Sequence, residues 1–520
     1  MPQEGKYATG KGDCFWTNNC IFCKNGVIRL YSVSNMSSRK ILILAIALPV
    51  LGAVVYSVKY SGKMCGGEYA NVKEYRCPRL YECVLESNKP NATGVCRFLP
   101  NGLRLWTQPV QGNEVVVIPP QKDPTVEYDI QTQKAKRLTF AQNKFGFELL
   151  KTAVFSDQTN NQNVVISPTS MGLAFSILYN GANASTKDQL TNVLQIPGFS
   201  LYDLNESARF LMTRLNASTP GISSNTSNSI WIKNGISLNE LVLSEAQTNY
   251  NAYITNLDFS SPQAPKTIND WVFGNTAGKI SNAVPNQVSA ETASYIINTA
   301  YFNGVWKYKF EKDKIENRDF YIYKYKQNGT KTSTPSMKMK RKDFLYFENE
   351  LFQAVKLPYG ADQKYYMVVL LPKEPGINTL LGKFDILNWQ TWMESFKEKD
   401  GTLYLPKFKL EYDGKMTSIL KSMGLVLPFD AEKADFSKLS ADGLSKEFYI
   451  SNVVHKTYID VNEEGTEAAA VTVIEVGNTS APILSPENQP FVMDVNKPFF
   501  FAIVNKETEA NFFVGIVRGL

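Results

Sequence analysis

The most restrictive feature of the sequence is an apolar run without charge from Ile41 to Val58, preceded by Arg39-Lys40 and followed by Lys59. As a helix rising about 1.5 Å per residue, it would measure roughly 27 Å, close to the hydrocarbon thickness of a bilayer. The run therefore predicts an uncleaved transmembrane signal anchor. A cleaved signal peptide is the competing interpretation, but it would need a long polar leader over residues 1–40. A helix buried in a protein core is the third interpretation of this run.

Glycosylation sequons favour an exoplasmic position for the part that follows this run. Flanking charge does not settle the orientation, because basic residues occur on both sides. One Asn-X-Ser/Thr sequon precedes the run, at Asn35, and the others follow it. These later candidates are Asn91, Asn183, Asn205, Asn216, Asn225, Asn328 and Asn478. We expect a single-pass membrane protein of the secretory route or cell surface, with a cytosolic tail over 1–40 and an anchor over 41–58; the alternative is a secreted protein.

Cysteines occur only in the first fifth of the chain, so the large C-terminal part folds without disulfides. Cys14, Cys20 and Cys23 precede the anchor, where the cytosol would keep them reduced. An even set of four follows the anchor in a short stretch containing Gly, Pro and Asn. The disulfide candidates are Cys65, Cys77, Cys83 and Cys96. They predict a small stapled stalk within 59–124, which ends in a linker, and leave three pairings open.

The remaining residues, 125–520, mix helical and strand periodicities. Phe145, Leu149 and Ala153 recur at helical spacing, whereas Tyr365–Leu371 and Phe512–Val517 are typical of buried strands. Helices are expected mostly early and long strands through the middle and end. This order predicts one large α+β domain.

Composition excludes several kinds of chemistry. The chain has one histidine, so zinc sites built from several imidazoles are unavailable, and we expect no metal or cofactor. The 55 basic residues are dispersed among 49 acidic ones, which argues against a nucleic-acid partner, and the basic run Lys338–Lys342 is read as a solvated face. Phosphate-binding and nucleophile motifs are absent from the sequence, so a membrane enzyme is the least favoured class. A surface adhesion protein acting through its stalk remains an alternative.

The most informative stretch is Ser451–Thr472, whose second half is rich in small side chains directly after a strand-like run. As a continued strand, its alternate positions from Thr466 to Val476 share one face that is small and uncharged at first and then apolar. Glu467 and Glu475 share the other face. Gly465 provides a flexible pivot before them. The segment is therefore suited to entering a packed sheet without burying charge.

With these residues, the chain resembles the serpin family. Four separate stretches carry the resemblance in the family's order, over roughly Leu138–Leu520. They are Asn163–Ser170, Asn298–Trp306, His455–Lys456 with Val461–Ala470, and Asn496–Ile503 with Phe513–Val517.

This resemblance implies a fold of three β-sheets and about nine helices, with an exposed reactive-centre loop over about 465–490. It also implies a monomeric suicide inhibitor of proteases, not an enzyme, whose cleaved loop inserts into the main sheet. The implied hinge consists of Glu463, Glu464, Gly465, Thr466, Glu467, Ala468, Ala469 and Ala470. Ser167, Ser170, Asn298 and His455 correspond to the hydrogen-bonded shutter of that sheet and Trp306 to its breach, where the loop enters. A non-inhibitory carrier or chaperone is the alternative, but no bulky, charged or proline residue spoils this hinge.

The usual hinge spacing, sixteen residues on from Glu463, places the reactive bond at Thr479-Ser480. A sequon begins at Asn478 and the distance to Pro498 is long, so Leu484-Ser485 is a rival. Thr479 suits elastase-like or subtilisin-like proteases, and Leu484 suits chymotrypsin-like ones. No Lys or Arg lies between Thr466 and Asn496, so the expected target, a serine or a cysteine protease, is not trypsin-like.

Overall fold

The chain divides into two compact units in the computed structural model, Met1–Glu127 and Tyr128–Leu520. The structure describes the backbone of the first unit's strands and most of the second unit. From residue 124 onward, the described ranges are 124–156, 162–216, 218–322, 330–373, 376–443, 448–466 and 489–520.

The described part of the first unit consists of two small antiparallel sheets. One contains β1 (Lys6–Ala8), β2 (Asp13–Thr17), β3 (Cys20–Cys23) and β4 (Arg29–Tyr31), and the other β5 (Met64–Gly66), β6 (Tyr81–Leu85) and β7 (Thr93–Phe98). The register of β6 and β7 places Cys83 opposite Cys96. The predicted anchor at 41–58 and Cys77 lie outside the described residues. None of the described helices is long and apolar enough to cross a membrane.

Nine α-helices are described, most of them early in the second unit, in agreement with the expected order and number. Their bounds are α2 Pro124–Phe155, α3 Pro168–Gly181, α4 Ala184–Val193, α5 Leu201–Leu215, α6 Glu240–Tyr250, α7 Ala264–Asn275, α8 Ile377–Leu381, α9 Ile386–Glu394 and α10 Met416–Ser422. Two short 3-10 helices, η3 (Lys312–Lys314) and η4 (Leu427–Phe429), complete the set in the described ranges.

The main sheet has seven strands, in the order β11-β10-β12-β20-β19-β18 with β9 paired to β10. Its strands are β9 Ser218–Thr219, β10 Ile222–Lys233, β11 Tyr253–Leu257, β12 Ser294–Val305, β18 Phe408–Lys415, β19 Asn452–Val461 and β20 Gly465–Thr466. Most of this sheet is formed by segments that are far apart in the chain.

The second sheet has nine strands, in the order β21-β17-β14-β15-β16-β22-β23-β8 with β13 paired to β14. They are β8 Val164–Ile166, β13 Ile315–Ile322, β14 Thr330–Glu348, β15 Phe352–Tyr359, β16 Tyr365–Pro372, β17 Lys397–Pro406, β21 Phe491–Asp494, β22 Phe499–Asn505 and β23 Asn511–Val517. Three sheets were expected, but the described residues of this unit form two, because β14 continues its pairing with β17 past a bulge between Arg341 and Phe344.

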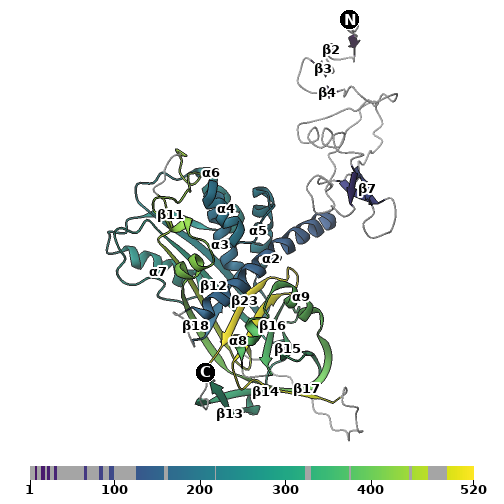
Figure 1. The fold of residues 1–520 in the computed structure, drawn as a ribbon, viewed down its shortest axis with the longest axis vertical. Helices are drawn as coiled ribbons and strands as arrows, with labels where there is room; N and C mark the ends of the chain where they lie inside the picture. Colours follow the sequence, from purple (N-terminus) through teal and green to yellow (C-terminus); the bar gives the residue numbers. More distant parts are fainter. Residues whose placement is uncertain are drawn as a thin grey trace. The chain divides into compact units, whose positions relative to one another are not determined.

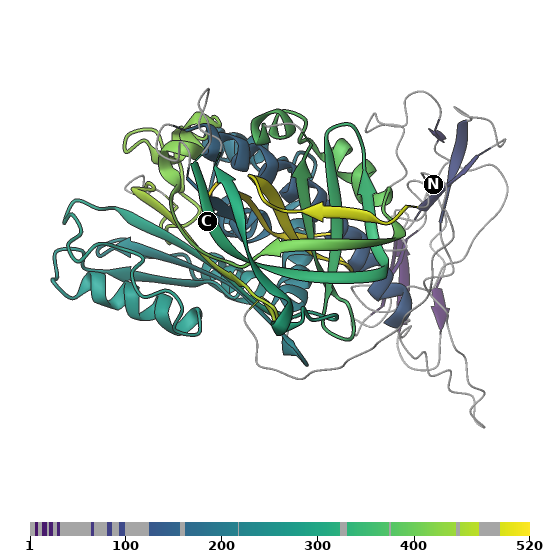
Figure 2. The same ribbon diagram turned by 90° about the horizontal axis from the view of Figure 1, so that it is seen from below.

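Two hydrophobic clusters cover the two faces of the main sheet. On one face, Ile296 and Ala300 of β12 belong to the large core that includes α2 and α3. On the other, Ile297 of β12 packs in a smaller cluster with Ile268 and Val272 of α7. Figures 1 and 2 show α7 on the side of these strands away from α2 and α3. The main sheet thus packs against helices on both faces, while alternate residues of its edge strand β18 are exposed.

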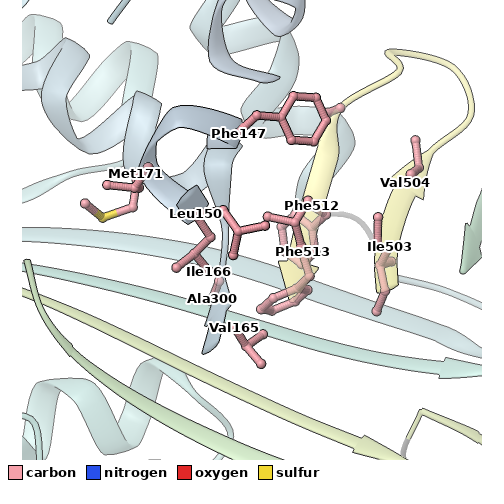
Figure 3. Packing of buried hydrophobic residues seen from close by; sticks show 14 of the residues in the cluster. Phe147, Leu150, Val165, Ile166, Met171, Ala300, Ile503, Val504, Phe512 and Phe513 are labelled. Atoms are coloured by element: carbon pink, nitrogen blue, oxygen red, sulfur yellow. The ribbon is translucent and has the colours of Figure 1, made fainter. Parts of the chain in front are cut away.

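The core joins both sheets through the elements predicted from apolar periodicity. Phe145, Leu149 and Ala153 of α2 are fully buried, and so are the predicted strand residues except Tyr366, which is partly buried. Figure 3 shows side chains of α2, β8, α3, β12, β22 and β23 converging in this core. The buried helix α3 therefore sits directly against β12, which brings its N-terminus to the residues described next.

Candidate functional site in the main sheet

Strands β12 and β19 pair with each other over only part of their lengths. Tyr295–Tyr301 runs parallel to Asn452–Tyr458, residue by residue. Beyond these residues β20 lies between the two strands, with Thr466 opposite Gly304 on one side and Val461 on the other. The main sheet is therefore closed at one end and already separated by a two-residue strand at the other.

A buried hydrogen-bond network spans the closed part and contains the four predicted shutter residues. His455 Nδ1 lies 2.6 Å from Asn298 Oδ1, and the Ser167 backbone N–H donates to His455 Nε2 at 2.9 Å. Asn298 Nδ2 donates to Ser170 Oγ at 2.6 Å. All four residues are fully buried. The network thus joins β12, β19 and the start of α3.

The sequence itself positions Ser167 and Ser170 for this network. Ser167 is the N-cap of α3, accepts from the Ser170 backbone N–H and precedes Pro168 at the first helical position. The helix therefore begins at a fixed residue against the sheet. Asn228 of β10 also belongs to the network, because its Oδ1 accepts from Asn298 Nδ2 at 2.5 Å. Sequence reasoning missed Asn228, and only its pairing opposite Asn298 reveals its role.

The imidazole of His455 acts as a hydrogen-bonding group, not a base. Its Nε2 accepts from a backbone amide, so Nδ1 carries the proton and donates to Asn298. Burial lowers the pKa of His455 to about 3, which keeps the ring neutral. No group of metal-ligating side chains occurs among the described residues. The site therefore joins β12, β19 and the start of α3 through hydrogen bonds.

Trp306, the predicted breach residue, holds the turn that leads into β20. Its ring stacks on Tyr359 with centroids 4.3 Å apart, and its Nε1–H donates to the Asn462 carbonyl at 2.9 Å. Its backbone N–H donates to the Glu464 carbonyl, also at 2.9 Å. The hydroxyl oxygens of Tyr359 and Thr466 lie 2.6 Å apart. Thr466, the last residue of β20, is fully buried.

The structure explains why glycine occurs at 465 and glutamate at 463 and 464. A Cβ at Gly465 would lie 2.0 Å from the Gly304 carbonyl oxygen, so no larger residue fits. Glu464 forms ion pairs with Lys309 and Lys312 at 2.7 and 2.9 Å, and Glu463 pairs with Lys407 at 2.7 Å. Hydrogen bonding from Lys309 lowers the pKa of the Glu464 carboxyl. Sequence reasoning missed these three lysines.

The other predicted site residues fall into two groups. Glu467, Ala468, Ala469, Ala470, Thr479, Ser480, Leu484 and Ser485 lie outside the described residues, as do Asn91, Asn328 and Asn478. Among the described sequon asparagines, the Asn205 amide donates to Asn180 and Glu245, Asn216 to the Thr226 carbonyl, and Asn225 to the Asn275 carbonyl. Asn183 Nδ2 has a longer contact of 3.4 Å to Ser437. A glycan at Asn205 would require its buried bonds to break.

These features define an α+β protein whose main sheet holds the two-residue strand β20 between two strands that otherwise pair with each other. The family model described as "Serpin (serine protease inhibitor)" matches residues 140–519. The chain belongs to the serpin family, whose members are generally protease inhibitors and not enzymes.

Similar proteins support this assignment over most of the second unit. An uncharacterized serpin-like protein of Methanosarcina acetivorans is 32% identical over 76% of this chain and 87% of its own. Iripin-2 of Ixodes ricinus is 33% identical over 75% of this chain and 95% of its own. The native-state crystal structure of tengpin, a thermophilic serpin, superposes with a TM-score of 0.66 at 29% identity, covering 74% of this chain and 94% of tengpin.

The neutral, buried His455 predicts a specific pH dependence. The unfolded chain binds a proton near pH 6.5, whereas the folded ring does so near pH 3. The stability from neutral His455 is thus fully present above pH 6.5 and is lost toward pH 3, by about 1.4 kcal/mol per unit. In NMR spectra, the only histidine should show an Nδ1–H tautomer that does not titrate between pH 8 and 4.5. The denatured chain is the control, and a folded-state midpoint near 6.5 would contradict this.

Proposed function

We propose that this protein is a suicide inhibitor of serine proteases whose cleaved loop enters the main sheet as a continuation of β20. The single observation that carries the proposal is the position of β20 between β12 and β19, antiparallel to both. The chain leaves this strand directly into the predicted loop. A longer strand would therefore only need to separate β12 from β19, starting where they have already parted.

The register of β20 supports this proposal residue by residue. Thr466 lies opposite Gly304 and Val461, so six further residues bring Thr472 opposite Asn298 and His455. Directly opposite residues share a face of a sheet. In the proposed inserted state, Thr472 would thus face the shutter network, on the face shared by the small, uncharged residues of the hinge. Glu467 would face the other side, beside the half-buried Asn303 and Asp460.

The same register supports Thr479-Ser480 as the reactive bond. The inserted strand reaches the start of β12 when Val476 lies opposite Ser294, ten residues on from Thr466. Thr479 lies three residues after Val476. A reactive bond at Leu484 would add five more residues between the sheet and the protease, about 17 Å when extended. The target's serine would attack the Thr479 carbonyl, forming an ester while the Ser480 amine leaves with a proton. A short tether then holds the protease against the end of the sheet, before water can hydrolyse the ester.

This mechanism predicts covalent complexes with elastase-like or subtilisin-like proteases. The complex should survive denaturing gels, and mass spectrometry should show a released C-terminal peptide that begins at Ser480. Chymotrypsin-like proteases should cleave at Leu484 with little trapping, because of the longer tether, and trypsin-like proteases should not be trapped. A stable complex with a peptide beginning at Ser485 would contradict the assigned bond. Cleavage without any complex would instead favour a non-inhibitory carrier or chaperone.

The hinge residue Thr466 provides a second prediction. Thr466→Arg would place a guanidinium in a fully buried position beside Tyr359, at a cost of several kcal/mol. We expect cleavage to continue while the yield of covalent complex falls by at least about tenfold. Glu467→Arg is the matched control, because its position in the inserted strand faces the other side. Equal complex yields for both variants would argue against the proposed register.

We further propose that residues 41–58 anchor the inhibitor in a membrane of the secretory route, by a stalk in which Cys83 pairs with Cys96. The uncharged apolar run and the opposite positions of these cysteines in β6 and β7 support this. The mature protein should sediment with membranes, resist carbonate extraction and carry a Cys83–Cys96 disulfide in non-reducing peptide maps. A wholly soluble product beginning beyond Val58 would contradict the anchor and favour the secreted form.

A further inference from the structure

A small cavity is lined in part by the segment Trp306–Phe310, whose backbone amides bond to the hinge residues Glu463 and Glu464. Its volume is about 200 Å³, below the range of roughly 300–1,000 Å³ for drug-sized ligands, so it suits a small molecule. Trp306, Phe310, Met339, Phe344 and Leu357 provide a buried apolar lining. The bulge of β14 between Arg341 and Phe344 forms part of this lining. Bulges of this kind often re-aim side chains at functional sites.

The cavity also has an excess of positive charge. Lys307, Arg341 and Lys356 line it, against the carboxylates of Asp343 and Glu398. Arg341 already pairs with Asp343 at 2.6 Å and lies over the Tyr308 ring. Within the described ranges, neither Lys307 nor Lys356 forms an ion pair with a carboxylate.

The partners of the two lysines in the described ranges are neutral: Lys307 Nζ lies 5.0 Å from the centroid of the Tyr308 ring, and Lys356 Nζ lies 4.3 Å from that of Phe396. Lys356 Nζ donates to the Met393 carbonyl at 2.7 Å, and burial together with Lys506 lowers the pKa of Lys356 to about 8. Hydrogen bonding from Arg341 and Lys307 lowers the pKa of the Tyr308 hydroxyl. The lowered pKa of the Tyr308 hydroxyl indicates a positive potential at this wall of the cavity, whereas the lowered pKa of Lys356 is mainly an effect of burial.

We propose that this cavity binds a small aromatic monoanion and that its occupation slows loop insertion. The carboxylate would lie between Lys307 and Lys356, and the ring would pack against Phe344 and Leu357. Aromatic carboxylates match the combination of apolar walls and two lysines without a carboxylate partner among the described residues, since charge-assisted hydrogen bonds are stronger where water is excluded. Nothing in the binding step depends on protease inhibition.

The effect on insertion rests on the proposed function. It follows because the segment Trp306–Phe310 both lines the cavity and bonds to the hinge. The Trp306 and Phe310 backbone amides donate to the carbonyls of Glu464 and Glu463, and the Lys307 amide donates to the Pro358 carbonyl of β15. A ligand behind this segment would tie the end of β12 to β14 and β15. Because β12 must move away from β19 for a strand to enter, the ligand should oppose that movement.

Binding is tested by titration calorimetry of the full chain with 2-naphthoate as the probe. We expect Lys356→Met and, separately, Lys307→Met to weaken binding by about tenfold or more, as expected for loss of a charged hydrogen bond. The matched control is Lys409→Met on β18, which removes an equal charge outside the cavity lining and should leave binding unchanged. Neutral 2-naphthalenemethanol should bind at least about tenfold more weakly. Equal affinities for both lysine variants and the native chain, or for both probes, would overturn the site.

Coupling is tested by the rate of covalent complex formation with a trapped protease, with and without saturating 2-naphthoate. We expect the probe to slow the native chain several-fold and to leave Lys356→Met unchanged at the same concentration. Unchanged rates in the native chain despite measured binding would overturn the coupling and leave the site standing. If no protease is trapped, the proposed function and the coupling fail together, and the calorimetry alone decides the binding site.

Discussion

The pairing of β12 with β19 is the constraint on which the rest of the main sheet depends. It is parallel, confined to Tyr295–Tyr301 and Asn452–Tyr458, and interrupted by β20 at one end. A strand continuing from β20 would replace this one parallel pairing with two antiparallel pairings, which are slightly more stable per residue. If such a strand forms, the arrangement before insertion has fewer backbone hydrogen bonds than the arrangement after it. Its persistence would be a matter of the barrier to separating two strands, which is kinetic stability.

The shutter network explains how such a barrier can be built from few residues. Separating β12 from β19 breaks the bond between Asn298 and His455 in a fully buried place, where an unmade hydrogen bond costs about 1–3 kcal/mol. In the proposed inserted state, the Thr472 hydroxyl stands between the same two side chains and can both donate and accept. In this proposal the lost hydrogen bond between Asn298 and His455 raises the free-energy barrier to insertion, but it does not destabilise the inserted state. A neutral histidine suits this role because burial lowers its pKa and keeps the ring uncharged while the sheet is closed.

Two kinds of feature can be predicted from the sequence: those encoded by neighbouring residues and those carried by the family resemblance. Contacts between distant segments could not be predicted. Apolar periodicity identified the buried faces of α2, β16 and β23, because burial of one face is encoded by neighbours in the chain. The resemblance brought Ser167, Ser170, Asn298 and His455 together. It did not reveal Asn228 or the lysines at 309, 312 and 407, since their partners lie about 55 to 155 residues away and no spacing rule links them. The joining of two expected sheets by β14 likewise depends on a bulge without a composition signal.

The lysines at 309, 312 and 407, which sequence reasoning missed, hold the hinge glutamates in place. A loop that inserts from one end needs a fixed point there, or the turn itself would slide before the strand advanced. Exposed ion pairs each contribute only about 0–1 kcal/mol, so none of these pairs fixes the turn alone. Glu464 is nearly buried, however, and two lysines hold its side chain while the Trp306 amide holds its carbonyl. With Gly465 allowing close contact to Gly304, the turn is clamped and the pivot beside it is free of a side chain. The same segment that clamps the turn also walls the cavity, which makes the hinge the natural place for a bound molecule to act.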